Sequence, residues 1–301
     1  MYDLVIIWLG SAGLPAWMYA SRYKIKNLII GSQDGWALAT SHRVENYPWI
    51  LSSPGKTIMQ TFKEHALSSG SDILLDQVVS VSRDSNNIFT IKTNTKEIQS
   101  KFLLMATGNN YKYLGVKGER EFLGKGVSYC ASCDGMFFKD RTVVVVWGGN
   151  TALTEALYLS ELCTKVYLVH RKDTFRADDV WIDQVKNKPN IELVLNEEVE
   201  EIGWALFMEE VVLKSWRHIQ ADGIFVAVGS IPNVSLVDSF QLQKDAEGCL
   251  VVDKRQETSV KWLYAAGDVT TNSNKFKQTI MSAAEGCLAA HSIHEDHMRQ
   301  G

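Results

Sequence analysis

The chain has 301 residues, of which 46% are hydrophobic and 22% are charged. This composition is typical of soluble globular proteins and the length allows two domains of ordinary size, so a disordered chain is excluded. Thirty-one Lys and Arg against 35 Asp and Glu give a formal net charge of −4, which argues against a nucleic acid or an anionic membrane as partner.

The apolar runs of the sequence have the length of strands and fall short of the roughly 20 residues that a membrane helix requires. The N-terminus carries Asp3 where a secretory signal would carry Lys or Arg. Five scattered cysteines do not make a disulfide framework and fit a reducing compartment. We therefore expect a cytoplasmic protein without a membrane segment.

The first 30 residues have the pattern strand, helix, strand. An apolar run over residues 4–9 leads into a turn of small residues at 10–13, an alanine-rich helical stretch covers 16–23, and a second apolar strand covers 26–30. Fully apolar strands joined by a helix are typical of a parallel sheet.

The same pattern returns in the middle of the chain. A strand at 142–146 is followed by a small-residue turn at 147–152, a helix at 153–162 and a strand at 165–169. Each copy is followed later by a strand that ends in small residues, at 102–108 and at 223–229. This internal duplication predicts an α/β protein with two Rossmann-like, three-layer dinucleotide-binding domains.

The C-terminal part contains a strand that ends in Gly267-Asp268 and a helix from about 278 to 291. If this part completes the first domain, the second domain is inserted into it. We then expect one discontinuous domain of residues 1–114 and 246–301, and an inserted domain of residues 117–242. The chain would cross between them near 112–118 and 241–247, two linkers that could form a hinge.

Cys130 and Cys133 form the sharpest local motif, Cys-Ala-Ser-Cys, which Asp134 follows. This spacing brings two sulfurs within bonding range, and a thiolate formed there can attack a partner disulfide. The carboxyl group of Asp134 can exchange a proton with the leaving thiol. A zinc site would need a second cysteine pair, which the sequence lacks, so redox chemistry is the preferred interpretation and no metal is expected.

Three histidines near the C-terminus, at 291, 294 and 297, could share a helical face as metal ligands. The acids between them favour a solvated helix end instead.

Beyond these motifs the sequence resembles the low-molecular-weight, flavin-dependent thioredoxin reductases almost from end to end. The segments that carry the resemblance are 44–48 (Val-Glu-Asn-Tyr-Pro), 106–108 (Ala-Thr-Gly), 126–135 around the cysteine pair, 170–177 (His-Arg-Lys-Asp-Thr-Phe-Arg-Ala) and 264–269 (Tyr-Ala-Ala-Gly-Asp-Val).

The resemblance implies a homodimer in which the outer segments bind FAD and the inserted domain binds NADPH. Electrons would pass from NADPH through the flavin to the cysteine pair, and then to thioredoxin or a thioredoxin-like protein. By this resemblance Cys133 lies against the flavin, Cys130 attacks the partner, and Asp134 acts as the acid. One domain would rotate against the other to bring the nicotinamide and the disulfide to the flavin in turn.

The resemblance and the two turns together give the expected cofactor residues. For FAD these are Gly10, Ser11, Ala12, Gly13, Leu38, Thr40, Asn46, Thr107, Gly108, Gly267, Asp268, Lys277 and Gln278. For NADPH they are Gly149, Asn150, Thr151, Ala152, His170, Arg171, Lys172 and Arg176. The cations of the second set can pair with a 2′-phosphate, although a solvated charged loop has the same composition.

Tryptophan replaces the first glycine of both fingerprints, at Trp8 and Trp147, and stands at further family glycine positions, Trp36, Trp49 and Trp262. An indole at the first fingerprint position should crowd the turn and the pyrophosphate path. A divergent member with altered cofactor use, an engineered chain and an error in the assigned sequence each account for this pattern.

These replacements leave two alternative functions open. A reductase of the same fold could receive electrons at its flavin from another donor, such as ferredoxin. If both fingerprints are blocked, the chain would be a cofactor-free binding protein on the same scaffold.

Overall fold

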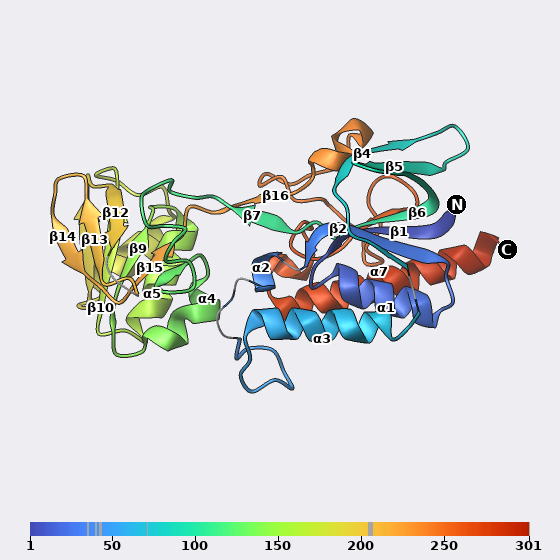
Figure 1. The fold of residues 1–301 in the computed structure, drawn as a ribbon. Coiled ribbons are helices and arrows are strands. Elements are labelled where there is room, and N and C mark those ends of the chain that lie inside the picture. Colours follow the sequence, from blue (N-terminus) through green and yellow to red (C-terminus); the bar gives the residue numbers. More distant parts are fainter. Residues whose placement is uncertain (35, 40, 42–43, 71, 204–206, 301) are drawn as a thin grey trace. The chain divides into compact units, whose positions relative to one another are not determined.

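The computed structural model describes residues 1–34, 36–39, 41, 44–70, 72–203 and 207–300. The chain divides into unit 1, Met1–Asn110 with Ile231–Gly301, and unit 2, Tyr111–Ser230. Both units are α/β, as Figure 1 shows, and the fold class predicted from the sequence is confirmed.

The second boundary between the units differs from the expected one. Residues 231–242 belong to unit 1, because Val237 and Leu242 are buried in its core. The chain therefore re-enters unit 1 at residue 231 and not between residues 241 and 247.

Unit 1 contains a seven-stranded sheet in the order β3-β2-β1-β6-β5-β4, with β17 also paired to β6. Strands β1, β2, β3, β6 and β17 run parallel, whereas β4 and β5 form an antiparallel extension. The sequence did not predict this extension. The strand bounds are β1 Tyr2–Leu9, β2 Asn27–Asp34, β3 Asp72–Leu74, β4 Val78–Arg83, β5 Phe89–Thr93, β6 Glu97–Met105 and β17 Leu263–Ala265.

Strand β1 is buried on both faces, which explains its continuous apolar run. Leu4 and Ile6 pack into one core cluster, and Val5 and Ile7 pack into another. Alternate side chains of a strand point to opposite faces, so a sheet covered on both sides needs apolar residues at every position.

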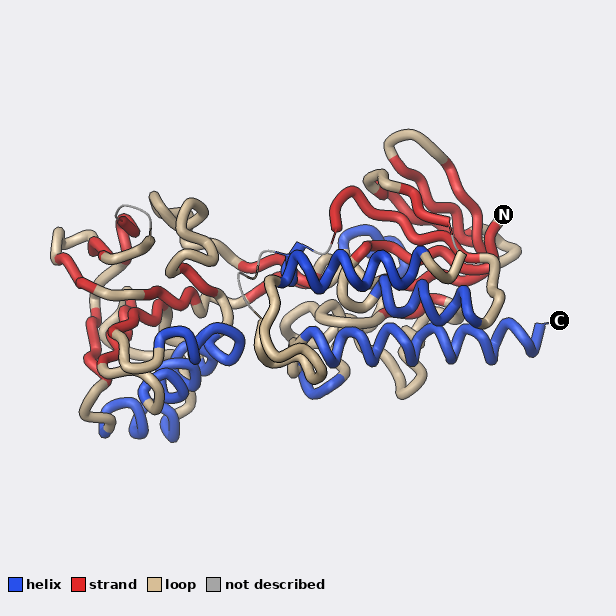
Figure 2. Tube along the Cα trace, turned by 60° about the horizontal axis from the view of Figure 1, so that its bottom comes forward, coloured by secondary structure: helices blue, strands red, loops and turns tan. Residues whose placement is uncertain are grey.

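Three helices lie side by side along one face of this sheet, as Figures 1 and 2 show. They are α1 (Gly13–Arg22), α3 (Gly55–Leu67) and α7 (Thr279–Gln300). The short helix α2 (Trp36–Ala39) and the 3₁₀ helices η2 (Ser235–Phe240) and η3 (Ser273–Lys275) complete the unit. Helix α1 packs on α7 through Gly286, where a Cβ atom would lie 2.1 Å from the carbonyl oxygen of Ala12.

Unit 2 repeats the strand–turn–helix arrangement around a five-stranded parallel sheet in the order β11-β10-β9-β15-β8. A three-stranded antiparallel sheet packs into its core. Its strands are β8 Val127–Ser128, β9 Thr142–Val146, β10 Lys165–His170, β11 Ile191–Leu195, β12 Val199–Gly203, β13 Glu210–Leu213, β14 His218–Gln220 and β15 Gly223–Val226. Its helices are α4 Ala131–Asp134, η1 Gly135–Phe138, α5 Asn150–Ser160 and α6 Asp179–Asn187.

The two segments that join the units pair with each other as β7 (Asn109–Tyr111) and β16 (Ser230–Pro232). Within unit 2, the buried carboxylate of Glu119 accepts hydrogen bonds from the backbone N–H groups of Leu114 and Gly115 at 2.8 Å. It also accepts one from the hydroxyl of Tyr129 at 2.7 Å. These bonds fix the first linker to the segment that leads into Cys130.

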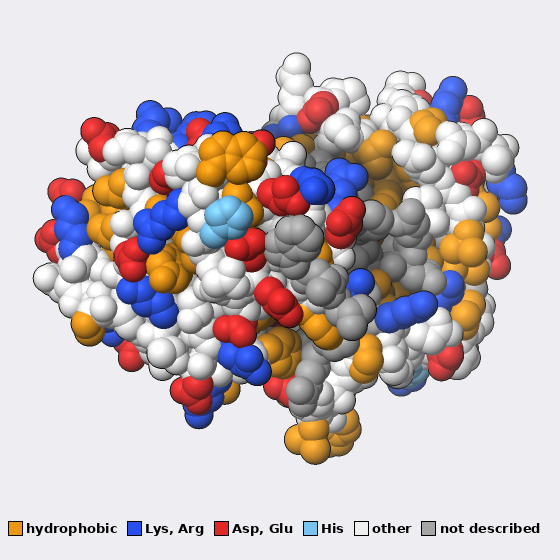
Figure 3. Space-filling view, turned by 60° about the vertical axis from the view of Figure 1, so that its left-hand side comes forward, with side chains coloured by type: hydrophobic (Ala, Val, Ile, Leu, Met, Phe, Trp, Pro, Cys, Tyr) orange, Lys and Arg blue, Asp and Glu red, His pale blue; other side chains and the backbone are white. Residues whose placement is uncertain are grey.

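On the face shown in Figure 3, Lys and Arg side chains are interspersed with Asp and Glu side chains. Among the described residues, no helix combines the length and the apolar character needed to cross a membrane.

The packing at Gly286 gives a test of the unit 1 architecture. Gly286→Ala would place a Cβ atom against a backbone oxygen that cannot rotate away, so we expect a loss of about 1–3 kcal/mol in the free energy of unfolding. The matched control is Gly203→Ala, where a Cβ atom meets nothing within 4 Å and little change is expected. Urea unfolding of both variants measures the difference, and equal stabilities would contradict the packing described.

Candidate active site

Cys130 and Cys133 form a disulfide bond at the start of helix α4. Cys130 is the N-cap residue of this helix and Cys133 lies within it, with their Cα atoms 5.3 Å apart. Both residues are half-buried. The pair is therefore a closed redox couple that solvent can reach.

Asp134 lies next to this couple and is held by Ser128. The hydroxyl of Ser128 donates a hydrogen bond of 2.6 Å to the Asp134 carboxylate, and it accepts one of 3.1 Å from the backbone N–H of Cys130. The carboxyl group is thus fixed within a network that includes the backbone of the first cysteine. This position suits the proton exchange predicted for Asp134.

Glu155 of helix α5 is a residue near the couple that the sequence did not reveal. Its Oε1 lies 3.5 Å from the backbone nitrogen of Ala131, the first residue of α4. Its Oε2 is buried and has no hydrogen-bond partner among the described residues. Burial raises the pKa of Glu155 to about 7, so this carboxyl is neutral over a wide range of pH.

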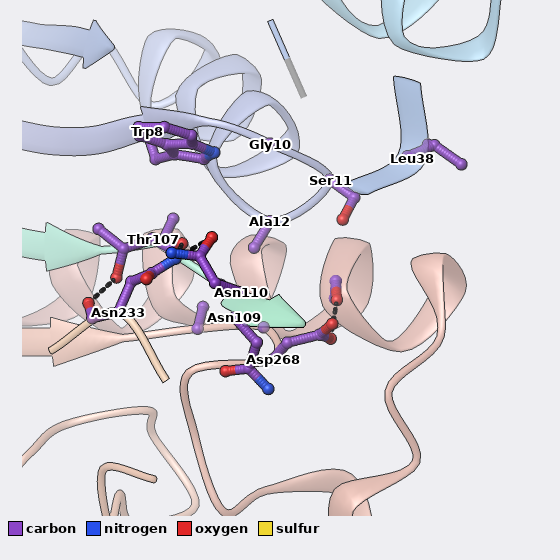
Figure 4. Close-up of a pocket in the computed structure, with 15 residues that line it drawn as sticks. Trp8, Gly10, Ser11, Ala12, Leu38, Thr107, Asn109, Asn110, Asn233 and Asp268 are labelled. Carbon is purple, nitrogen blue, oxygen red and sulfur yellow. Dashed lines mark hydrogen bonds between the residues drawn. The ribbon is translucent and has the colours of Figure 1, made fainter. Parts of the chain in front are cut away.

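The turn after β1 forms one wall of a cavity in unit 1. The cavity contains eight of the residues expected to bind FAD, from four separate segments (Figure 4). These are Gly10, Ser11, Ala12, Leu38, Thr107, Gly108, Gly267 and Asp268. Asn109, Asn110, Asn233 and Ser282 also line it, and the sequence pattern did not identify them.

Two acids lie beside this cavity, Glu285 buried and Asp268 half-buried. Asp268 accepts a hydrogen bond of 3.1 Å from the hydroxyl of Ser282, and burial raises its pKa. Glu285 accepts a hydrogen bond of 2.7 Å from the backbone N–H of Gly267, and burial raises its pKa too. Because Asp268 lines the cavity, its carboxyl group can exchange hydrogen bonds with ligand hydroxyls.

The remaining residues expected at FAD lie around this cavity or outside the described chain. Lys277 lines a smaller adjoining cavity. The side-chain amide of Asn46 donates a hydrogen bond of 3.0 Å to Gln278. Gly13 lies behind the turn, where a Cβ atom would be 2.0 Å from the carbonyl oxygen of Trp8. Thr40 lies outside the described residues.

Most of this cavity suits a dinucleotide, but Trp8 does not. Its indole lies at the same end of the cavity as Thr107 and Asn233, as Figure 4 shows, with Cδ1 3.2 Å from the Cβ position of Gly10. The free space measures about 60 Å³, against roughly 300–1,000 Å³ for typical ligand pockets. The crowding expected from Trp8 is thus present in the structure.

The corresponding turn of unit 2 starts helix α5. Gly149 is the N-cap residue, followed by Asn150, Thr151 and Ala152 in the first turn. The Asn150 side chain exchanges hydrogen bonds with Asp178, accepting from its backbone N–H at 2.8 Å. Trp147 stands at the first position of this turn, and the guanidinium of Arg171 lies 5.1 Å from its ring centroid.

The segment of residues 170–176, at the end of β10 and after it, combines exposed cations with a buried histidine ring. Arg171, Lys172 and Arg176 are exposed, and the Arg176 backbone N–H donates a bond of 2.7 Å to the carbonyl of Gly148. His170 instead is buried, stacks on Phe175 and makes a 3.1 Å hydrogen bond with the Thr174 carbonyl. Burial lowers its pKa, so it supports the turn as a neutral ring.

The histidines near the C-terminus contact aromatic residues. His294 stacks on Tyr23 with ring centroids 4.2 Å apart, and His291 forms a 3.1 Å hydrogen bond with the Tyr23 hydroxyl. The contacts that these two rings make thus belong to the packing of α7 on α1.

Comparison with known proteins shows which family has this architecture. Residues 2–286 match the pyridine nucleotide-disulphide oxidoreductase family. The chain is 35% identical over 299 residues to the thioredoxin reductase of Treponema pallidum, covering 97% of this chain and 95% of the relative. It is 37% identical over 302 residues to the glucosaminate ammonia-lyase of Pseudomonas fluorescens, covering 95% and 93% of the two chains.

Thioredoxin reductases are also found among the solved structures that resemble this chain. The thioredoxin reductase of Streptococcus pyogenes superimposes with a TM-score of 0.94 at 28% identity, covering 99% of both chains. The thioredoxin reductase of Giardia duodenalis superimposes with a TM-score of 0.90 at 32% identity, covering 98% of both.

The raised pKa of Glu155 predicts a pH-dependent effect on stability. Between pH 4.5 and about 7 the folded protein keeps a proton that the unfolded chain releases, so Glu155 destabilises the fold increasingly as the pH rises. We expect Glu155→Gln to stabilise the protein by about 1–3 kcal/mol at pH 8 and to have little effect at pH 4.

Chemical unfolding at the two pH values measures this difference. The control is Glu121→Gln, because Glu121 is exposed. A stabilisation by Glu155→Gln that is the same at both pH values would contradict the assigned ionisation.

Proposed function

The chain belongs to the pyridine nucleotide-disulphide oxidoreductase family as a flavoprotein of the thioredoxin reductase type, and on this basis we propose that NADPH is its electron donor and thioredoxin its acceptor. The cofactors of this family, FAD and NADPH, carry the two electrons when they are bound. The rest of the reaction falls to residues of the chain.

The Cys130–Cys133 disulfide carries this proposal. Two electrons and two protons convert it to a dithiol; one thiolate then attacks the acceptor disulfide, and the second thiolate displaces the acceptor thiol. The disulfide of the chain is restored and the acceptor leaves as a dithiol. Asp134, held by Ser128, is the group that can supply the proton to the departing thiol.

Overall similarity does not by itself identify the acceptor, because a relative at 37% identity is named for a lyase activity. The cysteine pair supports a disulfide acceptor, since full reduction of a disulfide to a dithiol needs one thiol to attack and a second, adjacent thiol to resolve the mixed disulfide. We assign the attack on the acceptor to Cys130 and the flavin contact to Cys133, following the family pattern.

The other cysteines do not offer an alternative couple. Cys163, Cys249 and Cys287 form no disulfide bond. Burial raises the pKa values of the Cys163 and Cys287 thiols to about 11, so they carry almost no thiolate at neutral pH.

The exposed cations beside the unit 2 turn support NADPH over ferredoxin as the donor. Arg171 lies over Trp147 and the backbone of Arg176 bonds to Gly148, both in the turn before α5, where a nucleotide of a Rossmann fold lies. A 2′-phosphate there would pair with these cations. A homodimer in the cytoplasm remains our prediction from the sequence.

Replacement of the cysteines tests the proposed exchange. Cys130→Ser and Cys133→Ser should each abolish NADPH-dependent reduction of a thioredoxin disulfide by the flavin-loaded enzyme, because neither can complete the exchange. Asp134→Asn should lower the rate by roughly 10²- to 10⁴-fold. Cys163→Ser is the control and should retain activity. Full turnover by Cys130→Ser would refute the proposal.

A second test addresses the nucleotide. The double variant Arg171→Ala with Arg176→Ala should raise the KM for NADPH by roughly 10- to 100-fold, the loss expected for charge-assisted hydrogen bonds to a phosphate. The KM for NADH should change little. Lys214→Ala, which removes an exposed lysine paired with Glu198, is the control. Equal increases in the KM for NADPH and the KM for NADH would contradict binding of the 2′-phosphate. Residues 171–176 would then be a solvated loop.

A further inference from the structure

Five tryptophans have the backbone conformation of glycine. Among the described residues, thirteen other than glycine have a positive φ, and five of these are tryptophans. Their φ angles are 98° at Trp8, 84° at Trp49, 126° at Trp147, 65° at Trp216 and 70° at Trp262. The other described tryptophans, Trp17, Trp36 and Trp181, lie in helices.

Three of these angles lie outside the region that side chains with a Cβ atom tolerate. The eight remaining non-glycine residues with positive φ lie between 50° and 66°, within the small left-handed region that Asn and Asp can enter. Trp8, Trp49 and Trp147 lie at 84° to 126°, and the positive-φ glycines of the chain span 61° to 123°. A bulky residue there is a clear outlier.

The local turns also call for glycine. The backbone N–H of Ile50 bonds to the carbonyl of Tyr47 at 3.1 Å, which places Pro48 and Trp49 at the two central positions of a turn. Proline followed by a residue of φ near +80° is the pattern of a type II turn, whose second central residue is normally glycine. The Trp49 side chain is fully exposed, so no packing compensates the strain.

Trp216 shows the same requirement in a hairpin. It is the last of the three residues between Leu213 and Arg217 in the connection from β13 to β14, and its backbone N–H bonds to the carbonyl of Leu213 at 2.8 Å. The Leu213 N–H in turn bonds to the Arg217 carbonyl at 2.9 Å. A three-residue loop that ends in a left-handed residue usually has glycine there. The Trp216 side chain is 75% exposed.

At the two nucleotide turns the indoles also interfere with the expected ligands. Trp8 occupies an end of the unit 1 cavity, and Trp147 lies under the guanidinium of Arg171, a cation assigned to the 2′-phosphate. Glycine at both positions would open the first cavity and free Arg171.

We propose that the functional protein carries glycine at positions 8, 49, 147, 216 and 262, and that one shared codon accounts for all five. The positions lie in both units, and they share a positive φ. UGA is read as tryptophan in some genetic codes and as glycine in others, so a UGA codon decoded as glycine by the host would produce this distribution. Only the cofactor part of this inference depends on the proposed function.

The direct test is peptide mass spectrometry of the protein purified from its own host. Peptides that span the five positions should each be lighter by the difference between a tryptophan and a glycine residue, and the gene should carry UGA at each position. Tryptophan in these peptides would overturn the proposal.

Recombinant variants test the conformational argument without any cofactor. Trp49→Gly and Trp216→Gly, both exposed, should each raise the thermal midpoint by roughly 2–4 °C through relief of left-handed strain. The control Trp181→Gly lies in helix α6 and should lower it, because glycine destabilises a helix interior. A lower midpoint in Trp49→Gly and Trp216→Gly would also overturn the proposal.

Flavin content separates this inference from the proposed function. Trp8→Gly should increase the FAD bound per chain after loading and desalting, measured by absorbance, whereas Trp216→Gly should not. If the midpoints rise and the peptides contain glycine, but Trp8→Gly binds no FAD, the assignment of glycine holds and the proposed flavin chemistry fails. If Trp8→Gly binds no more FAD than the tryptophan form and the peptides contain tryptophan, the inference is refuted.

Discussion

Close contact between backbone segments at the start of helix α1 is the constraint on which unit 1 depends. A Cβ atom on Gly13 would lie 2.0 Å from the carbonyl oxygen of Trp8, and one on Gly286 would lie 2.1 Å from that of Ala12. The turn is therefore held between the end of β1 and helix α7, with no room for a side chain at Gly13 or at Gly286. The same turn lines the cavity through Gly10, Ser11 and Ala12, so this packing fixes the shape of that wall.

Unit 2 uses the same turn with a different support. A Cβ atom on Gly148 would lie 2.5 Å from the ring of His170, and this ring stacks on Phe175. A histidine that the sequence placed among the phosphate-binding cations thus acts as a packing element beneath the turn. Burial lowers its pKa, which keeps the ring uncharged beside three cations and avoids adding a fourth charge.

The sequence predicted the parts of the fold that apolar strands and small-residue turns determine. The strands at 4–9, 142–146 and 165–169 and the insertion of one unit into the other follow from these patterns. The antiparallel strands were missed, because a segment such as Val78–Arg83 mixes valines with polar residues on a half-exposed edge. Glu155 was missed because a single glutamate in a helix has the same pattern whether its carboxyl faces solvent or protein. Four left-handed tryptophans stand where the family resemblance expects glycine, at positions 8, 49, 147 and 262, whereas Trp216 required the backbone angle.

The two units share a turn but differ in their electrostatics, and this difference indicates how a duplicated scaffold serves two ligands. The unit 1 cavity is lined by Asp268 and adjoins Glu285, whose pKa values burial raises. The carboxyl oxygens of Asp268 can accept hydrogen bonds from the hydroxyl groups of a ligand. The unit 2 turn instead contacts Arg171 and Arg176 of a segment with three exposed cations, Arg171, Lys172 and Arg176, which under the proposed function would pair with an additional phosphate. Under the proposed function, discrimination between the two dinucleotides would depend on the charges beside the turns, because both turns follow a parallel strand and start a helix.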